Sequence, residues 1–264
     1  MSAPLLQLIG VARAFGGVRA IDGLDMAVES GTILGLIGPN GAGKTTAFNV
    51  ISGLFDVTAG RIVFEGRDIN AMPVHRRVAA GICRTFQTPR LFEQMTAIET
   101  VMTGRHLRGH VGVLGAMFSI GRKRREEVAI RDSAYRLLER VGLGGQADRR
   151  AGALSYGHRR VLEIARALAA DPKLLLLDEV TAGLNPVETA EIADLIRSIA
   201  AGGVTVILVE HDMRFVSQLC GRVVVLNFGT KIAEGTPGDV LRDPEVVRAY
   251  LGQAPDAAPV LVGG

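Results

Sequence analysis

The chain has 264 residues, 48% of them hydrophobic, so it can bury a substantial core, and disorder is excluded for most of its length. Lysine and arginine number 30 and aspartate and glutamate 27, and the formal net charge of +3 is not the balance of a nucleic-acid-binding protein. The two cysteines, Cys83 and Cys220, form no paired motif, which argues against a disulfide scaffold or a zinc site and favours a reducing cytosol.

The sequence gives no sign of a membrane-spanning segment. The best apolar runs, residues 174–177 and 204–209, have the length of strands and fall far short of the roughly 20 residues that a transmembrane helix needs. Residues 1–10 lack the basic stretch and the cleavage site of a secretory signal. We therefore expect a protein that does not cross a bilayer by itself.

The first part of the chain predicts strands around a glycine-rich loop. Alternating apolar residues predict strands over residues 5–11 and 24–28, and a continuous apolar run predicts a buried strand over residues 33–37. Helical spacing follows over residues 43–51, and another strand is predicted at residues 61–65. The order is strand, glycine loop, helix, strand.

The middle of the chain predicts helices that alternate with buried strands. Residues 95–141 are mostly helical in spacing, and we interpret them as part of a helical insertion. Further helices are predicted at residues 155–170 and 186–201, and strands at residues 173–178 and 204–209. This alternation is typical of a parallel sheet covered on both faces.

The last part of the chain predicts a hairpin at residues 223–232, followed by short helices. From about residue 254 the chain is rich in proline, alanine and glycine, and we expect residues 254–264 to form a mobile tail. The sequence contains no internal repeat and no long coiled-coil insertion.

Residues 38–45 read Gly-Pro-Asn-Gly-Ala-Gly-Lys-Thr and complete a G-x-x-x-x-G-K-[ST] phosphate loop between a predicted strand and a predicted helix. In such a loop, backbone N–H groups converge on phosphates and the helix N-terminus adds its positive dipole end. Lys44 reaches the β- and γ-phosphates, and the hydroxyl of Thr45 is offered to Mg²⁺. The predicted nucleotide-binding residues here are Gly38, Pro39, Asn40, Gly41, Ala42, Gly43, Lys44, Thr45 and Thr46.

Two carboxylates, Asp178 and Glu179, end the predicted strand of four leucines. Alone, such a pair more often caps a helix or faces solvent. In a parallel sheet, however, the strand ends face the same crevice as a phosphate loop, so both acids are predicted to point at the nucleotide. Asp178 would hold Mg²⁺ through its water shell, and Glu179 would orient or deprotonate the attacking water.

Three other positions carry weak signals when taken singly. Ser155 begins a helix and is an ordinary N-cap residue. Gln87 follows a strand predicted at residues 82–86, and His211 also follows a predicted strand; a polar residue at such a place needs no functional explanation.

Together, the order of these residues resembles the nucleotide-binding subunit of ATP-binding cassette (ABC) transporters over nearly the whole chain. The resemblance implies an α/β fold of the P-loop NTPase class: a RecA-like core, an antiparallel β subdomain, and a helical subdomain inserted at about residues 90–170. It implies one ABC ATPase domain over residues 4–253, which hydrolyses ATP with Mg²⁺ at a dimer interface.

The resemblance also implies roles for single residues. Phe15 would stack on adenine, Gln87 would sense Mg²⁺ and the attacking water, and His211 would contact the γ-phosphate. The signature residues Ser155, Tyr156 and Gly157 would address the nucleotide held by the other subunit.

The details resemble most the larger ATP-binding subunit of branched-chain amino acid importers, the LivG type. The segments that carry this likeness are residues 15–20, 84–87, 90–92, 182–186 and 209–213. The implied partners are two membrane-spanning permease subunits, a second ATP-binding subunit (a relative or another copy), and indirectly an extracytoplasmic solute-binding protein. The implied location is the cytoplasmic face of the inner membrane. The permease and binding protein, rather than this chain, would select the solute.

The same likeness places residues 87–92 beneath a groove that receives a short helix from each membrane subunit. Leu91 and Phe92 would then be covered by that helix, with about 1.5–3 kcal/mol of apolar burial for each side chain. The alternative is that both side chains pack inside the helical subdomain and serve only folding.

Three positions depart from the usual pattern: Tyr156 replaces a glycine, His158 replaces a glutamine and Val180 replaces a proline. His158 would make the closing of two subunits around nucleotide pH-dependent. Two alternatives stay open. One is a soluble ABC protein of DNA repair or translation, although these carry coiled-coil insertions or two cassettes. The other is a regulatory cassette that does not hydrolyse ATP, against which Glu179 and His211 argue.

Overall fold

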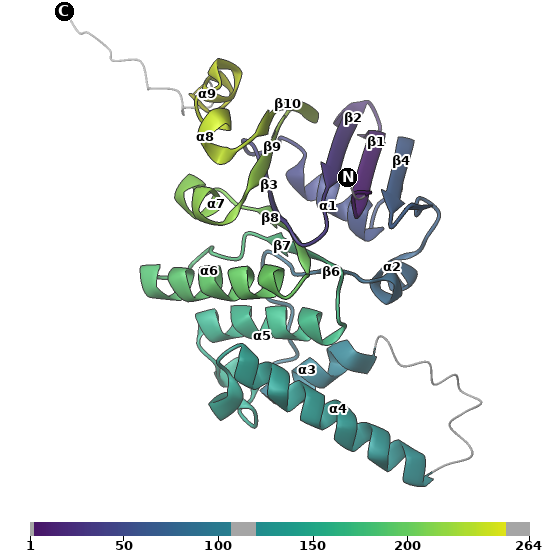
Figure 1. The fold of residues 1–264 in the computed structure, drawn as a ribbon, viewed down its shortest axis with the longest axis vertical. Coiled ribbons are helices and arrows are strands. Elements are labelled where there is room, and N and C mark those ends of the chain that lie inside the picture. Colours follow the sequence, from purple (N-terminus) through teal and green to yellow (C-terminus); the bar gives the residue numbers. More distant parts are fainter. Residues whose placement is uncertain (1–2, 107–119, 252–264) are drawn as a thin grey trace, which may run out of the picture.

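The structure is a computed structural model that describes residues 3–106 and 120–251. One sheet has the strand order β10-β9-β3-β8-β7-β6, and a second has the order β2-β1-β4-β5 (Figure 1). The first consists of β3 (Ile33–Ile37), β6 (Ile82–Arg84), β7 (Leu174–Asp178), β8 (Thr205–Val209), β9 (Arg222–Asn227) and β10 (Thr230–Gly235). The second consists of β1 (Leu6–Phe15), β2 (Val18–Val28), β4 (Ala59–Phe64) and β5 (Arg67–Asp68).

Strand direction separates the two sheets. In the first sheet all neighbouring strands run parallel except β9 and β10, which form an antiparallel hairpin. In the second sheet every pair is antiparallel. A parallel sheet beside a separate antiparallel sheet is the predicted P-loop NTPase architecture, with its antiparallel β subdomain.

The described helices fall into two groups. The helices around the sheets are α1 (Lys44–Ser52), α2 (Val74–Ala80), α6 (Pro186–Ala201), α7 (Met213–Leu219), α8 (Pro237–Val240) and α9 (Pro244–Leu251). The remaining three are α3 (Ala97–His106), α4 (Ile120–Arg140) and α5 (Tyr156–Ala169), which lie together below α6 (Figure 1). These three share a hydrophobic cluster of their own. They occupy the segment predicted as the helical insertion.

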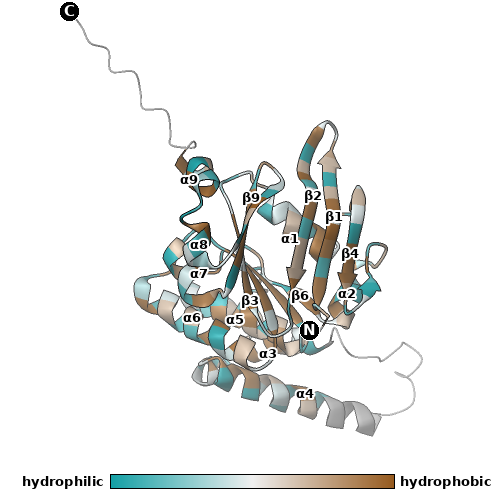
Figure 2. Ribbon diagram, turned by 45° about the horizontal axis from the view of Figure 1, so that its top comes forward, coloured by the Kyte–Doolittle hydropathy of each residue, from teal (hydrophilic) through white to brown (hydrophobic). Residues whose placement is uncertain are grey.

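The central strand β7 shows how the parallel sheet is buried on both faces. Leu174 and Leu176 pack in the core shared with α1 and the second sheet, whereas Leu175 and Leu177 pack in the core under α6 and α7. All four leucines are 0% exposed. Figure 2 shows the strands of this sheet coloured mostly as hydrophobic. A continuous apolar run is therefore required here, because side chains alternate between two cores.

Local sequence signals set the ends of α6. The side chain of Asn185 accepts hydrogen bonds from the backbone N–H groups of Val187 and Glu188, and the Glu188 carboxylate accepts one from the backbone N–H of Asn185. Pro186 occupies the first turn. The helix covers residues 186–201, as predicted.

Some predicted boundaries were wrong. The strand expected to reach Phe86 ends at Arg84, because β6 pairs with β7 only through residues 82–84. The helices α2 and α7 were not predicted, because each has only seven residues, too few to show a helical period. The tail at residues 254–264 lies outside the described residues. In the described part of the chain, no helix is long and apolar enough to cross a membrane.

Candidate active site

The ends of neighbouring parallel strands bring the predicted site residues to one edge of the first sheet. The phosphate loop, residues 38–46, follows β3, and Glu179 follows β7 directly. His211 comes two residues after β8, and Gln87 three residues after β6. Gln87 does not line the hollow of about 190 Å³ that lies beside the phosphate loop. That hollow is lined by Ala20, Asn40, Gly41, Ala42, Gly43, Lys44, Thr45, Thr46, Glu179 and His211.

Two glycines give the phosphate loop its course. Gly38 has a φ of 148° and Gly43 a φ of 104°, in a region that other residues avoid. A Cβ atom on Gly38 would lie 2.1 Å from the carbonyl oxygen of Leu226, and one on Gly43 would lie 2.5 Å from that of Ala20. Both positions therefore require glycine, and the loop runs against neighbouring backbone.

Lys44 lies inside the phosphate loop rather than in solvent. Its side chain donates to the carbonyl oxygens of Gly38 at 2.6 Å and Pro39 at 2.8 Å, and the residue is 6% exposed. Burial lowers the pKa of Lys44, while the charges of Glu179 and Asp178 act in the opposite direction. The ammonium group is thus held within the loop, where phosphate oxygens would be stronger acceptors than carbonyls.

Glu179 is held between the two other predicted catalytic residues. The Nε2 atom of Gln87 donates to Oε2 of Glu179 at 2.5 Å, and Nε2 of His211 lies 2.7 Å from Oε1. Glu179 has a φ of 47°, which is strained for a residue with a side chain. The structure therefore brings Gln87, Glu179 and His211 together, with the carboxylate fixed by a partner on each oxygen.

Asp178 has an ionic partner that the sequence did not reveal. Its Oδ2 atom lies 2.7 Å from Nη2 of Arg84, and Nη1 of Arg84 donates to Oδ1 of Asn49 at 2.5 Å. The side chains of Arg84 and Asp178 are 8% and 5% exposed. The one available signal was an arginine at the end of an apolar strand.

Glu210 is a second residue that sequence reasoning missed. It is buried, and it accepts hydrogen bonds from the backbone N–H groups of Thr181 and His211. Burial raises the pKa of Glu210, and the hydrogen bonds from Thr181 partly oppose that shift. Through these two hydrogen bonds the carboxylate links the segment after Glu179 to the start of the His211 loop. Val180, between Glu179 and Thr181 in the chain, is buried in the core.

The loop that carries Gln87 is held by α5. Arg160 donates to the carbonyl oxygens of Phe86 and Gln87, and Arg166 donates to the carbonyl oxygen of Arg90. Glu163 accepts from the backbone N–H groups of Phe86 and Arg90, and its burial raises its pKa. Side chains of α5, the helix that begins at the signature, therefore fix the backbone around Gln87 by hydrogen bonds.

Of the signature residues, Ser155 caps α5 and Tyr156 and Gly157 begin it, and none of the three lines the hollow described above. Ser155 accepts from the N–H of His158 at 3.2 Å, and the hydroxyl of Tyr156 accepts from Arg160. A Cβ atom on Gly157 would lie 2.5 Å from Oε1 of Glu188, so glycine lets α5 approach α6.

Phe15 also lies outside the lining of that hollow. It is 41% exposed at the end of β1 and meets the Phe55 ring edge-on, with 5.2 Å between the centroids. The guanidinium of Arg13 lies 4.6 Å from the Phe15 centroid.

The donor set around the phosphate loop fits Mg²⁺ bound together with a nucleotide. Thr45 offers a hydroxyl, Asp178 a carboxylate and Gln87 an amide oxygen, all of them the hard oxygen ligands that Mg²⁺ prefers. Within the described residues, no group of three or more His, Cys, Asp or Glu could hold a metal ion.

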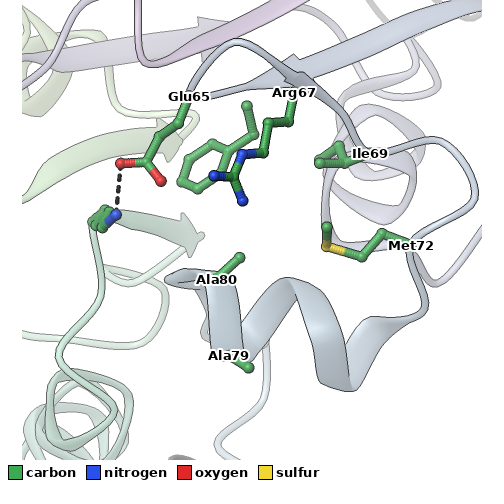
Figure 3. A pocket seen from close by; sticks show the side chains of 8 residues that line it. Glu65, Arg67, Ile69, Met72, Ala79 and Ala80 are labelled. Carbon is green, nitrogen blue, oxygen red and sulfur yellow. Dashed lines mark hydrogen bonds and ion pairs between the residues drawn. The ribbon is translucent and has the colours of Figure 1, made fainter.

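A second hollow, of about 500 Å³, lies away from these residues between β4, β5 and α2 (Figure 3). Its rim carries Arg67 and an ion pair between Glu65 and Lys173 with a separation of 2.6 Å. Lys173 precedes β7, so this hollow is near the opposite end of that strand from Glu179. None of the predicted site residues lines it.

A phosphate loop after β3, a carboxylate pair at the end of β7 and a parallel sheet between helices define a P-loop nucleoside triphosphatase. The ABC transporter family profile matches residues 21–182, and a profile described as branched-chain amino acid ATP-binding cassette transporter matches residues 230–256.

Similar proteins agree with this class. BraF of Pseudomonas aeruginosa, named a high-affinity branched-chain amino acid transport ATP-binding protein, is 42% identical over 96% of this chain and all of its own. LivG of Escherichia coli, which carries the same description, is 40% identical over the same shares. The crystal structure of the ADP conformation of MJ1267, an ATP-binding cassette of an ABC transporter, superposes with a TM-score of 0.84 and is 33% identical, covering 96% of this chain and all of its own. The chain belongs to the ABC transporter family of ATP-binding proteins, and it is an ATPase.

The substitution Glu210→Gln should remove a pH-dependent cost of folding. Because the pKa of Glu210 is raised in the folded protein, folding favours the protonated form, and stability falls as the pH rises from 4.5 through the folded value. The variant has no such charge, so its free energy of unfolding should rise relative to the parent over that range. Urea unfolding from about pH 4 to about pH 9 measures the difference. A difference that does not change with pH contradicts the prediction.

Proposed function

We propose that this chain is the ATP-hydrolysing subunit of an importer for branched-chain amino acids or related small solutes, and that it energises uptake through separate membrane subunits. The observation that carries the proposal is the fixed Glu179 carboxylate between Gln87 and His211, beside the phosphate loop. The names of BraF and LivG, with 42% and 40% identity, support the solute class.

In this proposal the phosphate loop binds ATP through residues 38–46. Lys44 leaves its carbonyl partners for the β- and γ-phosphates, and Phe15 stacks on adenine. Thr45, Gln87 and Asp178 would hold Mg²⁺, which neutralises phosphate charge when bound. The loop and the helix N-terminus bring fixed positive dipoles to the same anion.

Hydrolysis in this proposal depends on Glu179. Gln87 and His211 keep the carboxylate in one orientation, so that it can orient the attacking water and accept its proton. His211 lines the same hollow as Glu179 and the phosphate loop, and it would contact the γ-phosphate. The strained backbone at Glu179 is consistent with a side chain held for function rather than for local stability.

The substitution Glu179→Gln should abolish most turnover while ATP binding persists. The glutamine keeps the shape of the side chain but cannot accept the proton, so the hydrolysis rate should fall by roughly 10²–10⁴-fold. Phosphate release and calorimetric ATP binding measure the two effects. Glu65→Gln is a matched control, since Glu65 also has a positive φ, of 49°, but belongs to the distant ion pair with Lys173. Turnover of Glu179→Gln within about threefold of the parent would remove Glu179 from this role.

A second ATP-binding subunit, either a relative or another copy, is part of the proposal. Ser155 is exposed at the N-terminus of α5, next to the half-buried Tyr156 and the buried Gly157, and none of the three lines the hollow beside the phosphate loop of this chain. This end of α5 would face a nucleotide held by the partner. The hydrogen bonds from α5 to the Gln87 loop would then connect the signature, which faces the partner's nucleotide, with the nucleotide site of this chain.

If two half-sites form each active site, hydrolysis should depend on assembly. Specific activity should rise with protein concentration, or should appear only after a second related ATPase subunit is added. Phosphate release across a dilution series, with mass measured by light scattering, tests this. A specific activity that stays constant in a sample shown to be monomeric contradicts it.

The membrane partners in this proposal are two permease subunits at the cytoplasmic face of the inner membrane, with an extracytoplasmic solute-binding protein acting through them. Of the two apolar residues expected to meet a permease, Leu91 packs against the cluster of α3, α4 and α5. Phe92 is 65% exposed. Phe92 is therefore the side chain that a partner would cover.

The substitution Phe92→Ser should uncouple the chain from transport. Because Phe92 is exposed, the variant should fold and keep near-normal basal ATPase activity, but it should bind the membrane subunits more weakly and lose uptake. Co-purification with the permease and solute uptake in vesicles measure this. Val187→Ser, at a 68% exposed residue of α6, is the control and should leave both unchanged. Unimpaired uptake by Phe92→Ser, or loss of ATP binding, would show that the assignment is wrong.

A further inference from the structure

Arg84 is a buried cation at the end of β6 that the proposed mechanism does not use. Its side chain is 8% exposed. The guanidinium carbon lies 5.5 Å from the ring centroid of Phe48 and 5.4 Å from that of Phe86. Contacts of this kind with aromatic faces hold a guanidinium in a defined plane.

The two outer nitrogens of Arg84 join separate parts of the site. Nη1 donates to Oδ1 of Asn49 at 2.5 Å, and Nη2 lies 2.7 Å from Oδ2 of Asp178. The Nε atom is buried and has no hydrogen-bond partner. A buried arginine with an unpartnered donor is unfavourable for folding, so stability alone is a poor explanation for its presence.

Asn49 connects this bridge to the phosphate loop. It lies four residues after Thr45, so the two side chains share one face of α1. Through its contacts with Asn49 and Asp178, Arg84 therefore connects the face of α1 that carries Thr45 with the carboxylate at the end of β7. Thr45 and Asp178 are two of the residues assigned above to Mg²⁺.

We propose that Arg84 is a positioning residue for the Mg²⁺ that accompanies ATP. By engaging Oδ2 of Asp178, it fixes the carboxylate and leaves Oδ1 for the hydration shell of the ion, while its bond to Asn49 sets the distance between Asp178 and α1. The inference rests on the proposed Mg²⁺ role of Asp178. Partners that orient a metal-binding carboxylate commonly change metal affinity by about 10- to 100-fold when they are removed.

A role of Arg84 through charge alone and a role in positioning predict different Mg²⁺ affinities, which makes the inference testable. Removing a positive charge beside Asp178 makes the site more negative, so charge alone predicts tighter Mg²⁺ binding in Arg84→Met and no change in Arg84→Lys. Lysine keeps the charge but lacks the planar pair of donors that reaches both Asn49 and Asp178. Positioning therefore predicts weaker Mg²⁺ binding in both variants.

The experiment measures the gain in affinity that Mg²⁺ gives to a non-hydrolysable ATP analogue. The full chain is titrated calorimetrically with the analogue in EDTA and in excess Mg²⁺, for the parent, Arg84→Met, Arg84→Lys and Asn49→Leu. Affinity in EDTA should stay within about twofold of the parent. The gain with Mg²⁺ should fall by about tenfold in both Arg84 variants, and in the same direction in Asn49→Leu.

Arg77→Met is the matched control. Arg77 is also buried, and it donates to carbonyl oxygens of Val50 and Ile51 at the other end of α1. Its replacement should lower the melting temperature without changing the gain with Mg²⁺.

An unchanged or larger gain in the Arg84 variants overturns the proposal. If Arg84→Met does not fold, Arg84→Lys and Asn49→Leu decide by the same criterion. A parent that shows no gain with Mg²⁺ overturns the Mg²⁺ assignment of Asp178 instead, and the role of Arg84 with it.

Discussion

The site depends on one constraint, which is that parallel strands end at the same edge of their sheet. Each of four strands delivers one part at that edge: β3 the phosphate loop, β7 the acidic pair, β8 the His211 loop and β6 the Gln87 loop. The strands are held in register by side chains buried in two cores, one on each face. The relative positions of groups far apart in the sequence are therefore set by the packing of the sheet, before any ligand contributes.

Each charged group at this edge has a partner that fixes it. Lys44 donates to two loop carbonyls, Asp178 is paired with Arg84, and Glu179 is held by Gln87 and His211. Charges buried in this way cost free energy of folding unless they are hydrogen-bonded. A site built from such groups is pre-organised, because the dipoles and charges are in place before the nucleotide arrives.

The sequence predicted the parts of the site that are encoded locally. A phosphate loop is one continuous motif, and four leucines followed by two acids indicate a buried strand that ends at a ligand crevice. It could not predict the ion pair between Arg84 and Asp178, which joins residues 94 positions apart. Nor could it predict the hydrogen bond from Arg160 to the carbonyl oxygen of Gln87, 73 positions away. Such pairs follow from how helices and strands pack, and no local pattern carries them. For the same reason the sequence does not distinguish Leu91 from Phe92, although Leu91 packs against the cluster of α3, α4 and α5 and Phe92 is exposed.

A crystal structure with a non-hydrolysable ATP analogue and Mg²⁺ tests the central claim most directly. The account predicts that the phosphates lie against residues 38–46, that Lys44 exchanges the carbonyl oxygens of Gly38 and Pro39 for phosphate oxygens, and that the γ-phosphate faces Glu179 and His211. Phosphates bound elsewhere, for example beside Glu65 and Lys173 in the second hollow, would contradict it.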